Sequence, residues 1–419
     1  MAFGRIPRFS PSFSPREALA AAAALLRDDA AADAEAVGRF ERRFAELIGV
    51  PHAIMVPSAR YGFYLLLSAI GVGPGDEVVV PGLTYFAIPA MVPLLGATPV
   101  FADVGLRSHV LDPDAFAAAL SPRTKAVVPT HLFGTPCEMD RIVQIAKDAG
   151  VAVIEDCAQS TGARYRGQRV GSVGDHAYYT FGLTKNITTL SGAMVTTTDD
   201  AVAAKVRAAL AGAGPTPRRK LAKEVATGAA MWAATHPALY WATVHPAVVV
   251  GNRLGKDPIH EPFGEPEVRY TKVSSSYTTQ GRARAAQAEV GLRQLDRIDA
   301  LNGARVRNGR RLDEALAHVP GLATPTYPEG AEPIYMSFVV NHPRRDALAA
   351  ALRARGVDTT IGYMNAFGDH PLFPEHKRDC PNAARAMAEL LHLPVHPNLS
   401  AADLDHMVEA VRSAALEVG

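Results

Sequence analysis

The chain has few cysteines and no excess of either charge, and both shortages narrow the function classes. Only three cysteines occur among 419 residues, Cys137, Cys157 and Cys380, and their wide spacing matches no zinc-binding pattern. So few cysteines in a long chain favour a reduced, cytoplasmic protein. Lysine and arginine total 43 against 42 for aspartate and glutamate, which gives no support for a nucleic-acid partner.

Two further signals are missing from the sequence. No apolar h-region follows the first residues, and the alanine-rich stretch 17–33 carries Arg27 and Asp28, so we expect a surface helix there and no signal peptide. No Gly-x-Gly-x-x-Gly motif joins an early strand to a helix, which argues against a Rossmann-type dehydrogenase.

What the chain does contain is apolar sequence in a regular order. Hydrophobic residues make up 48% of it, and 419 residues suit a large domain with a smaller one beside it. Apolar periodicity and turn signals alternate between strands and helices, which predicts an α/β fold with a mostly parallel sheet covered by helices. In such sheets the chemistry lies in loops at the carboxyl ends of the strands. The expected strands are 77–81, 98–103, 125–130 and 151–156, and the expected helices are 34–48, 59–70 behind Ser58, 138–149 and 280–300.

The carboxyl-terminal part differs in character. A strand over 334–340 and helices over 344–354 and 401–416 predict a smaller α+β domain. We therefore expect a large domain over 1–275 and a small domain over 276–419.

Residues 212–275 interrupt the strand–helix rhythm. A basic loop, 216–220, precedes the apolar stretch 222–251, in which Pro237 and Pro246 argue against one membrane-spanning helix. Two interpretations stay open. The stretch packs on its own domain or across a dimer interface, or it forms a hairpin in peripheral contact with a membrane or a lipid.

The strongest chemical signal lies between residues 151 and 195. A buried strand ends in Glu155-Asp156, and Lys185 follows in a later polar loop. Pyridoxal phosphate (PLP) requires such a pair, because a lysine forms a Schiff base with its aldehyde and an acid keeps its ring nitrogen protonated. Taken alone, a strand-end aspartate is often a helix cap and a loop lysine is usually solvated.

The order of the motifs around this pair resembles the DegT/StrS family of PLP-dependent sugar aminotransferases. That family has a strand ending in Glu-Asp-x-Ala-Gln, a Gly-Ala pair, a glycine-rich turn, Ser-Phe and Lys-Asn. The matching segments here are Glu155 to Gln159, Gly162-Ala163, Gly171 to Gly174, Thr180-Phe181 and Lys185-Asn186, together with Gly73 to Val78, Gly96 to Phe101, His131 to Gly134 and Leu393 to Pro397.

The resemblance implies a role for each matching position. Lys185 is the catalytic residue, which holds PLP and then moves a proton between Cα and C4′. Asp156 pairs with the pyridine nitrogen, and Gln159 lies near the ring hydroxyl. Tyr85 stacks on the ring. Thr180 takes the place of a phosphate-binding serine and keeps its hydroxyl.

Several positions depart from the family pattern. Ser58-Ala59-Arg60 stands where the family has Ser-Gly-Thr, so Ala59 would offer its amide to the phosphate and the Arg60 guanidinium would replace a lost hydroxyl. Gln280 stands for an asparagine that the partner subunit contributes, which implies a homodimer with a shared active site. Two further departures, Leu190 to Ala193 and Gly362-Tyr363, leave the acceptor open.

The resemblance implies a type I PLP-dependent transferase fold, with a mostly parallel seven-stranded sheet, helices on both faces and a smaller α+β domain. It implies an aminotransferase that uses PLP, with pyridoxamine phosphate during turnover. Glutamate is the expected donor, and the acceptor is a keto group on a sugar-like, nucleotide-linked or lipid-linked molecule. The alternatives are a dehydratase or deoxygenase of the same family, in which histidine typically replaces the lysine, and a non-catalytic membrane-associated scaffold. No metal site is expected.

Overall fold

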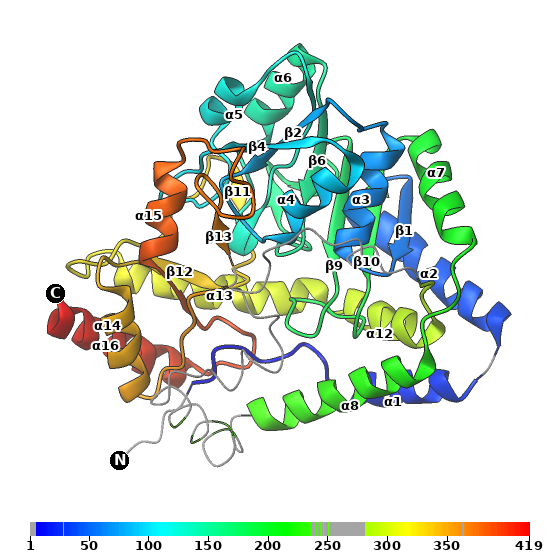
Figure 1. The fold of residues 1–419 in the computed structure, drawn as a ribbon. Helices are drawn as coiled ribbons and strands as arrows, with labels where there is room; N and C mark the ends of the chain where they lie inside the picture. The colour runs from blue at the N-terminus through cyan, green and yellow to red at the C-terminus, as the bar shows by residue number, and fades with distance from the viewer. Residues whose placement is uncertain are drawn as a thin grey trace.

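A seven-stranded sheet forms the centre of the molecule (Figure 1). The computed structural model describes residues 6–27, 29–236, 240, 244, 246, 250, 281–362 and 364–419. In spatial order the strands are β1 (His52–Val56), β10 (Ala193–Thr197), β9 (His176–Thr180), β6 (Ala152–Asp156), β5 (Thr124–Val127), β2 (Glu77–Pro81) and β4 (Thr98–Ala102). Only β10 runs against the others, so the predicted mostly parallel sheet is confirmed.

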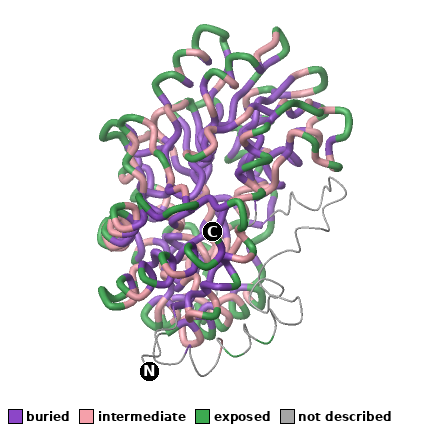
Figure 2. The backbone as a smooth tube through the Cα atoms, turned by 90° about the vertical axis from the view of Figure 1, so that its left-hand side faces the viewer, coloured by how far each residue is buried: buried purple, intermediate pink, exposed green. Residues whose placement is uncertain are grey.

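The strands are apolar because helices cover the sheet. All five residues of β2 are buried, as expected for a central parallel strand. The covering helices include α2 (Ala30–Ile48), α3 (Ala59–Ala69), α5 (Pro113–Ala119), α6 (Met139–Ala149) and α7 (Asp200–Ala211). Figure 2 shows buried backbone through the middle of the molecule and exposed backbone at its outer turns. The large core therefore lies between this sheet and its helices.

The predicted helix ends agree with the local signals. The Ser58 hydroxyl caps α3 by accepting a hydrogen bond from the Tyr61 amide at 3.2 Å. Gly49 and Gly150 end α2 and α6 with φ values of 89° and 67°, in the left-handed region that glycine reaches without strain.

A second, smaller core lies in the carboxyl-terminal part. Here β12 (Phe338–Asn341) pairs antiparallel with β14 (Leu390–Leu393). Helices α13 (Ile298–Leu316), α14 (Arg345–Ala354) and α16 (Ala401–Val418) pack around this pair. Ile6, near the amino terminus, joins the same core by bridging to Val357.

Segments that belong to the larger core also occur late in the sequence. Helix α12 (Ala285–Leu295) packs on α2. The short strand β13 (Asn365–Ala366) pairs with β3 (Leu83–Thr84), and α15 (Pro381–Glu389) packs beside them. These later segments thus contribute to the larger core, and a single division at residue 275 stays a prediction.

Several sequence-based boundaries were wrong, and the strand expected over 125–130 already ends at Val127. The helix expected over 280–300 is two helices, α12 and α13, separated by a turn at Asp296 and Arg297. The strand expected from 334 begins only at Phe338, because Tyr335 has a φ of 52° and its neighbours bond to the 133–134 backbone instead. The stretch 17–33 is also divided, between α1 (Pro15–Leu26) and α2, because Asp29 caps the start of α2.

Helix α8 (Arg218–Thr235) contains the first part of the predicted insertion. Its apolar residues Leu221 and Val225 belong to a third cluster with Phe13 and Val290, between α1 and α12. For this helix, packing on the chain's own domain is therefore favoured over membrane contact. Most of 237–275 lies outside the described residues. No described helix is long and apolar enough to cross a membrane.

The contact between α2 and α12 requires a glycine. A Cβ atom at Gly291 would lie 2.5 Å from the ring of the buried Phe40. We expect Gly291→Ala to destabilise the protein by about 1–3 kcal/mol through overpacking. At Gly303, on α13, the nearest atom to such a Cβ is Arg307 Nη1 at 3.6 Å.

Gly303→Ala is the matched control, since it should stabilise its helix by up to ~1 kcal/mol. Thermal unfolding of both variants checks the prediction. Equal shifts of Tm in the same direction would contradict the packing described here.

Candidate active site

The predicted site residues follow parallel strands that end at one edge of the sheet. Asp156 ends β6 and Thr180 ends the neighbouring β9. Tyr85 follows β2 and β3, between β3 and α4 (Ala87–Met91). Carboxyl ends of parallel strands share an edge, so the topology gathers these residues where α/β enzymes place their chemistry.

Asp156 is a buried acid. One carboxylate oxygen accepts a hydrogen bond from the Ala158 amide at 2.9 Å, and the other lies 3.5 Å from the Thr130 hydroxyl. Burial raises the pKa of Asp156, while the Ala158 hydrogen bond and the charge of Lys185 oppose the rise. A cationic partner, such as a protonated ring nitrogen, would lower this pKa again and favour the charged carboxylate.

Lys185 lies in the loop between β9 and β10. Burial lowers the pKa of its amine, and the Asp156 charge opposes this shift. Within the described part of the chain, its Nζ atom makes no hydrogen bond. The Lys185 amine therefore lies close to a buried carboxyl group, and burial favours its neutral form.

Neighbouring residues fix the lysine loop from several sides. The Asn186 amide donates to the Thr161 carbonyl at 2.7 Å and to Asn302 Oδ1 at 3.2 Å. The Ser12 hydroxyl donates to the Asn186 carbonyl at 2.7 Å. On the other side of the loop, Thr188 donates its amide to Gln294 Oε1 at 2.8 Å. A loop braced in this way gives Lys185 a defined position.

Gln159 and Lys185 line the same cavity. The Phe133 amide donates to Gln159 Oε1 at 3.0 Å, which leaves the side-chain nitrogen directed toward Met364 Sδ at 4.0 Å. This hydrogen bond orients the Gln159 side chain beside the lysine.

The strand register places the two segments that are predicted to bind the phosphate near each other. Val56 lies level with Ala193 on β10, and Ala193 lies level with Thr180 on β9. Adjacent strands are about 4.8 Å apart, so roughly 10 Å separate Val56 from Thr180. Ala59 and Arg60 begin α3 just beyond Val56, and first-turn amides of a helix favour anions. The arrangement fits a phosphate between the start of α3 and the end of β9.

The remaining predicted residues are less closely placed. The half-buried Tyr85 ring packs edge-on against Phe86, with 4.6 Å between their centroids. Gln280 and Tyr363 lie outside the described residues. The roles of Ala59, Arg60, Tyr85, Thr180 and Gln280 stay predictions.

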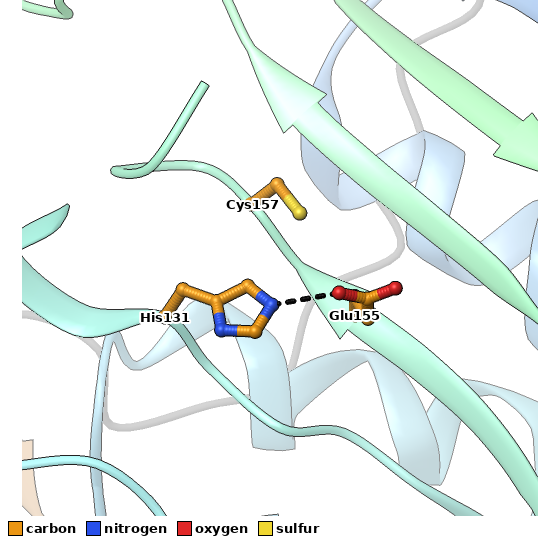
Figure 3. Close-up of side chains that lie close together, drawn as sticks. All are labelled: His131, Glu155 and Cys157. Atoms are coloured by element: carbon orange, nitrogen blue, oxygen red, sulfur yellow. Dashed lines mark hydrogen bonds and ion pairs between the residues drawn. The ribbon is translucent and has the colours of Figure 1, made fainter. Parts of the chain in front are cut away.

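Next to Asp156, a buried pair braces the strand ends (Figure 3). His131 Nδ1 accepts a hydrogen bond from the Cys137 amide at 3.0 Å, so its Nε2 carries the proton that is donated to Glu155 at 2.9 Å. Glu155 also accepts from the amides of Gly171, Val173 and Gly174, at 2.8, 2.9 and 2.7 Å.

Cys157 lies close enough to this pair to suggest a metal site. However, both His131 nitrogens and both Glu155 oxygens are already hydrogen-bonded, and burial raises the pKa of the Cys157 thiol well above its ordinary value. The thiolate that a metal would need is therefore disfavoured. These contacts make the cluster a structural brace.

Sequence reasoning missed several residues that line the lysine cavity. Arg8 and Ser10 come from the amino-terminal segment, Arg305 from α13, and His392 from the carboxyl-terminal part. Nothing local in the sequence marks them, because only the fold brings such distant segments together.

A lysine amine with a lowered pKa lies beside a buried carboxyl group at the strand ends of an α/β sheet. PLP-dependent aminotransferases of the type I fold depend on this arrangement. The sequence model of the DegT/DnrJ/EryC1/StrS aminotransferase family matches residues 14–246 and 263–412. The chain belongs to this family and is a PLP-dependent aminotransferase. The match includes 212–246, so much of the stretch predicted as an insertion is shared with the family.

Individual relatives agree with this assignment. GDP-perosamine synthase of Caulobacter vibrioides is 33% identical over 385 residues, which cover 90% of each chain. Spore coat polysaccharide biosynthesis protein SpsC of Bacillus subtilis is 30% identical over 387 residues, 90% of this chain and 88% of the relative. Among solved structures, the aminotransferase from Psychrobacter cryohalolentis superposes with a TM-score of 0.77 at 27% identity and covers 99% of both chains. DesV of S. venezuelae gives 0.76 at 28% identity and covers 98% of both.

The brace around Glu155 can be tested by removing its charge. In Glu155→Gln, an amide NH2 would face N–H groups that now donate to a carboxylate. We expect a loss of about 2–3 kcal/mol in stability, because buried donors would lose their acceptor. PLP affinity should fall as well, since Asp156 adjoins Glu155.

Glu138→Gln makes the same chemical change at the start of α6, where the Glu138 side chain caps no amide. Its Tm and PLP affinity should match those of the wild type. Calorimetry and PLP titration measure both effects, and a fully stable Glu155→Gln protein would be evidence against the brace.

Proposed function

We propose that the enzyme moves an amino group from glutamate to the keto group of a nucleotide-linked sugar. The observation that carries this proposal is Lys185, an amine with a lowered pKa beside the buried Asp156. The family assignment and the relative named GDP-perosamine synthase support a sugar acceptor linked to a nucleotide.

Each residue of the site has its own role in the proposed reaction. Bound PLP supplies an aldehyde that accepts an amine and a ring that takes up electrons when a proton leaves the substrate carbon. Asp156 would hold the protonated ring nitrogen, and the start of α3 together with Thr180 would hold the phosphate. Lys185 Nζ, without a hydrogen-bond partner among the described residues, can take the proton from the substrate carbon and return it.

The presence of Lys185 also decides against the dehydratase alternative. That branch of the family typically has histidine at this position, whereas this chain retains the lysine, the acid and the glutamine. A non-catalytic scaffold would have no need for an amine whose pKa is lowered by burial.

Substituting the lysine tests the proposal directly. Borohydride treatment of the PLP-loaded wild-type enzyme should fix the cofactor on Lys185, as peptide mass spectrometry can show. Lys185→Ala should abolish transfer of isotopically labelled nitrogen from glutamate to a panel of nucleotide-linked keto sugars, because the proton-carrying amine is gone. The Tm should stay close to that of the wild type.

Lys205→Ala is a suitable control, because Lys205 lies on α7 and donates to the Ala69 carbonyl at 2.7 Å, away from the lysine cavity. Labelled transfer by Lys185→Ala, or borohydride labelling at another lysine, would contradict the assignment. Failure of every sugar acceptor with the wild-type enzyme would overturn the acceptor class alone.

We also propose that the enzyme is a homodimer in which the partner's Gln280 completes each site. This follows from the family resemblance at Gln280-Gly281-Arg282. Mixing the inactive Lys185→Ala variant with Gln280→Ala should then restore activity, because each hybrid dimer contains one site with both native residues.

Random exchange of subunits should restore about one quarter of the wild-type activity, since half of the dimers are hybrids with one intact site. The two variants assayed separately are the controls. A mixture no more active than its components would show that Gln280 does not act across the interface.

A further inference from the structure

Arg305 is a buried arginine in the wall of the lysine cavity. It lies on α13, it is 4% exposed, and it lines the cavity together with Lys185 and Gln159. Its Nη1 atom donates to the Met336 carbonyl at 3.3 Å, while its buried Nε has no hydrogen-bond partner among the described residues. A guanidinium group thus reaches the cavity with donor capacity to spare.

The charge of Arg305 is not compensated by the described part of the chain, since no described carboxylate forms an ion pair with it. Burial alone lowers its pKa to about 10, and no neighbouring acid opposes that shift. The group remains protonated at neutral pH. Burying an unpaired cation destabilises a folded protein, so a group kept in this state is suited to a charged ligand.

Two other basic groups in the cavity wall, Arg8 and His396, do not share this property. Arg8 forms a bidentate ion pair with Asp358, with both hydrogen bonds at 2.8 Å. Burial and the charge of Arg305 lower the pKa of His396 to about 4, so this histidine is neutral. None of the described residues that line the cavity is acidic. Arg305 therefore gives the cavity a positive charge that no lining carboxylate compensates.

We propose that Arg305 binds a carboxylate group of the amino donor and positions the donor against Lys185. This inference rests on the proposed transamination and deepens it by assigning a residue to donor recognition. A carboxylate carries one negative charge and accepts hydrogen bonds in the plane of a guanidinium group. Amino-acid donors and their keto-acid products both carry such a group.

A phosphate group suits this position less well. Phosphate carries nearly two charges at neutral pH, whereas Arg305 offers one positive charge among mostly apolar and neutral polar side chains. The cofactor phosphate already has a fitting place at the start of α3, beyond the β1 end of the sheet.

The test compares Arg305→Gln with Arg307→Gln, which makes the same change at an exposed position of the same helix. Glutarate, a dicarboxylate without an amino group, serves as the binding probe for the PLP-loaded enzyme in calorimetry. Arg305→Gln should weaken glutarate binding by about 10- to 100-fold, the size expected for a lost charged hydrogen bond. Arg307→Gln should bind it like the wild type.

Single-turnover rates then identify the carboxylate. Glutamate, glutamine and the α-amide of glutamate are compared as donors. Arg305→Gln should lower the single-turnover rate with glutamate. This loss of rate should vanish with either glutamine or the α-amide, namely with the donor that lacks the carboxylate that Arg305 contacts. Arg305→Met should retain or raise the Tm of the ligand-free protein, because it removes a buried unpaired charge.

Four results would overturn the proposal. They are unchanged glutarate affinity, equal losses for all three donors, a loss of PLP affinity that would assign Arg305 to the cofactor, and weakened binding of a nucleoside diphosphate with glutarate binding intact. Failure of the wild-type enzyme to aminate any sugar acceptor would count against the proposed function alone, because glutarate binding is measured without turnover.

Discussion

The arrangement of the site depends on one buried carboxylate, Glu155. It receives three backbone amides from the glycine-rich turn and the Nε2–H group of His131, so four hydrogen bonds converge on a side chain with no exposed surface. These contacts tie the end of β6 to the segment after β5 and to the turn before β9. Asp156 is the next residue, and its position relative to Lys185 follows from this brace.

Opposite pKa shifts in one small region are the chemical result. Burial raises the pKa of Asp156 and lowers that of Lys185, and each group partly opposes the shift of the other. Burial disfavours the charged form of both groups, and the charge of each favours the charged form of the other. The hydrogen bonds around Asn186 hold the Lys185 loop in place. Folding thereby keeps the amine and the carboxyl group close together and away from solvent, where their pKa values would return to the ordinary range.

Much of this could be predicted from the sequence, because strands, caps and motif order are local properties. The sheet, the start of α3 behind Ser58 and the pair Asp156 and Lys185 are examples. Boundaries that depend on tertiary contacts were missed: Tyr335 adopts a left-handed conformation because its neighbours bond to the 133–134 backbone. Arg305 was missed because it is one of four arginines within seven residues of α13, a pattern typical of a solvated face, and only packing shows which one is buried.

The amino-terminal segment links the first residues of the chain to nearly the last. Ile6 bridges to Val357, His396 Nε2 donates to the Pro7 carbonyl, and Asn398 donates to the Ser10 hydroxyl. Ser12 meanwhile holds the carbonyl next to Lys185. During synthesis, at about 5–20 residues per second, this segment must wait for roughly 390 further residues before the last of its partners exist. The wall of the active site is therefore completed only after His396 has been synthesised, and a ribosome that stops before His396 releases a chain whose catalytic lysine has no finished pocket around it.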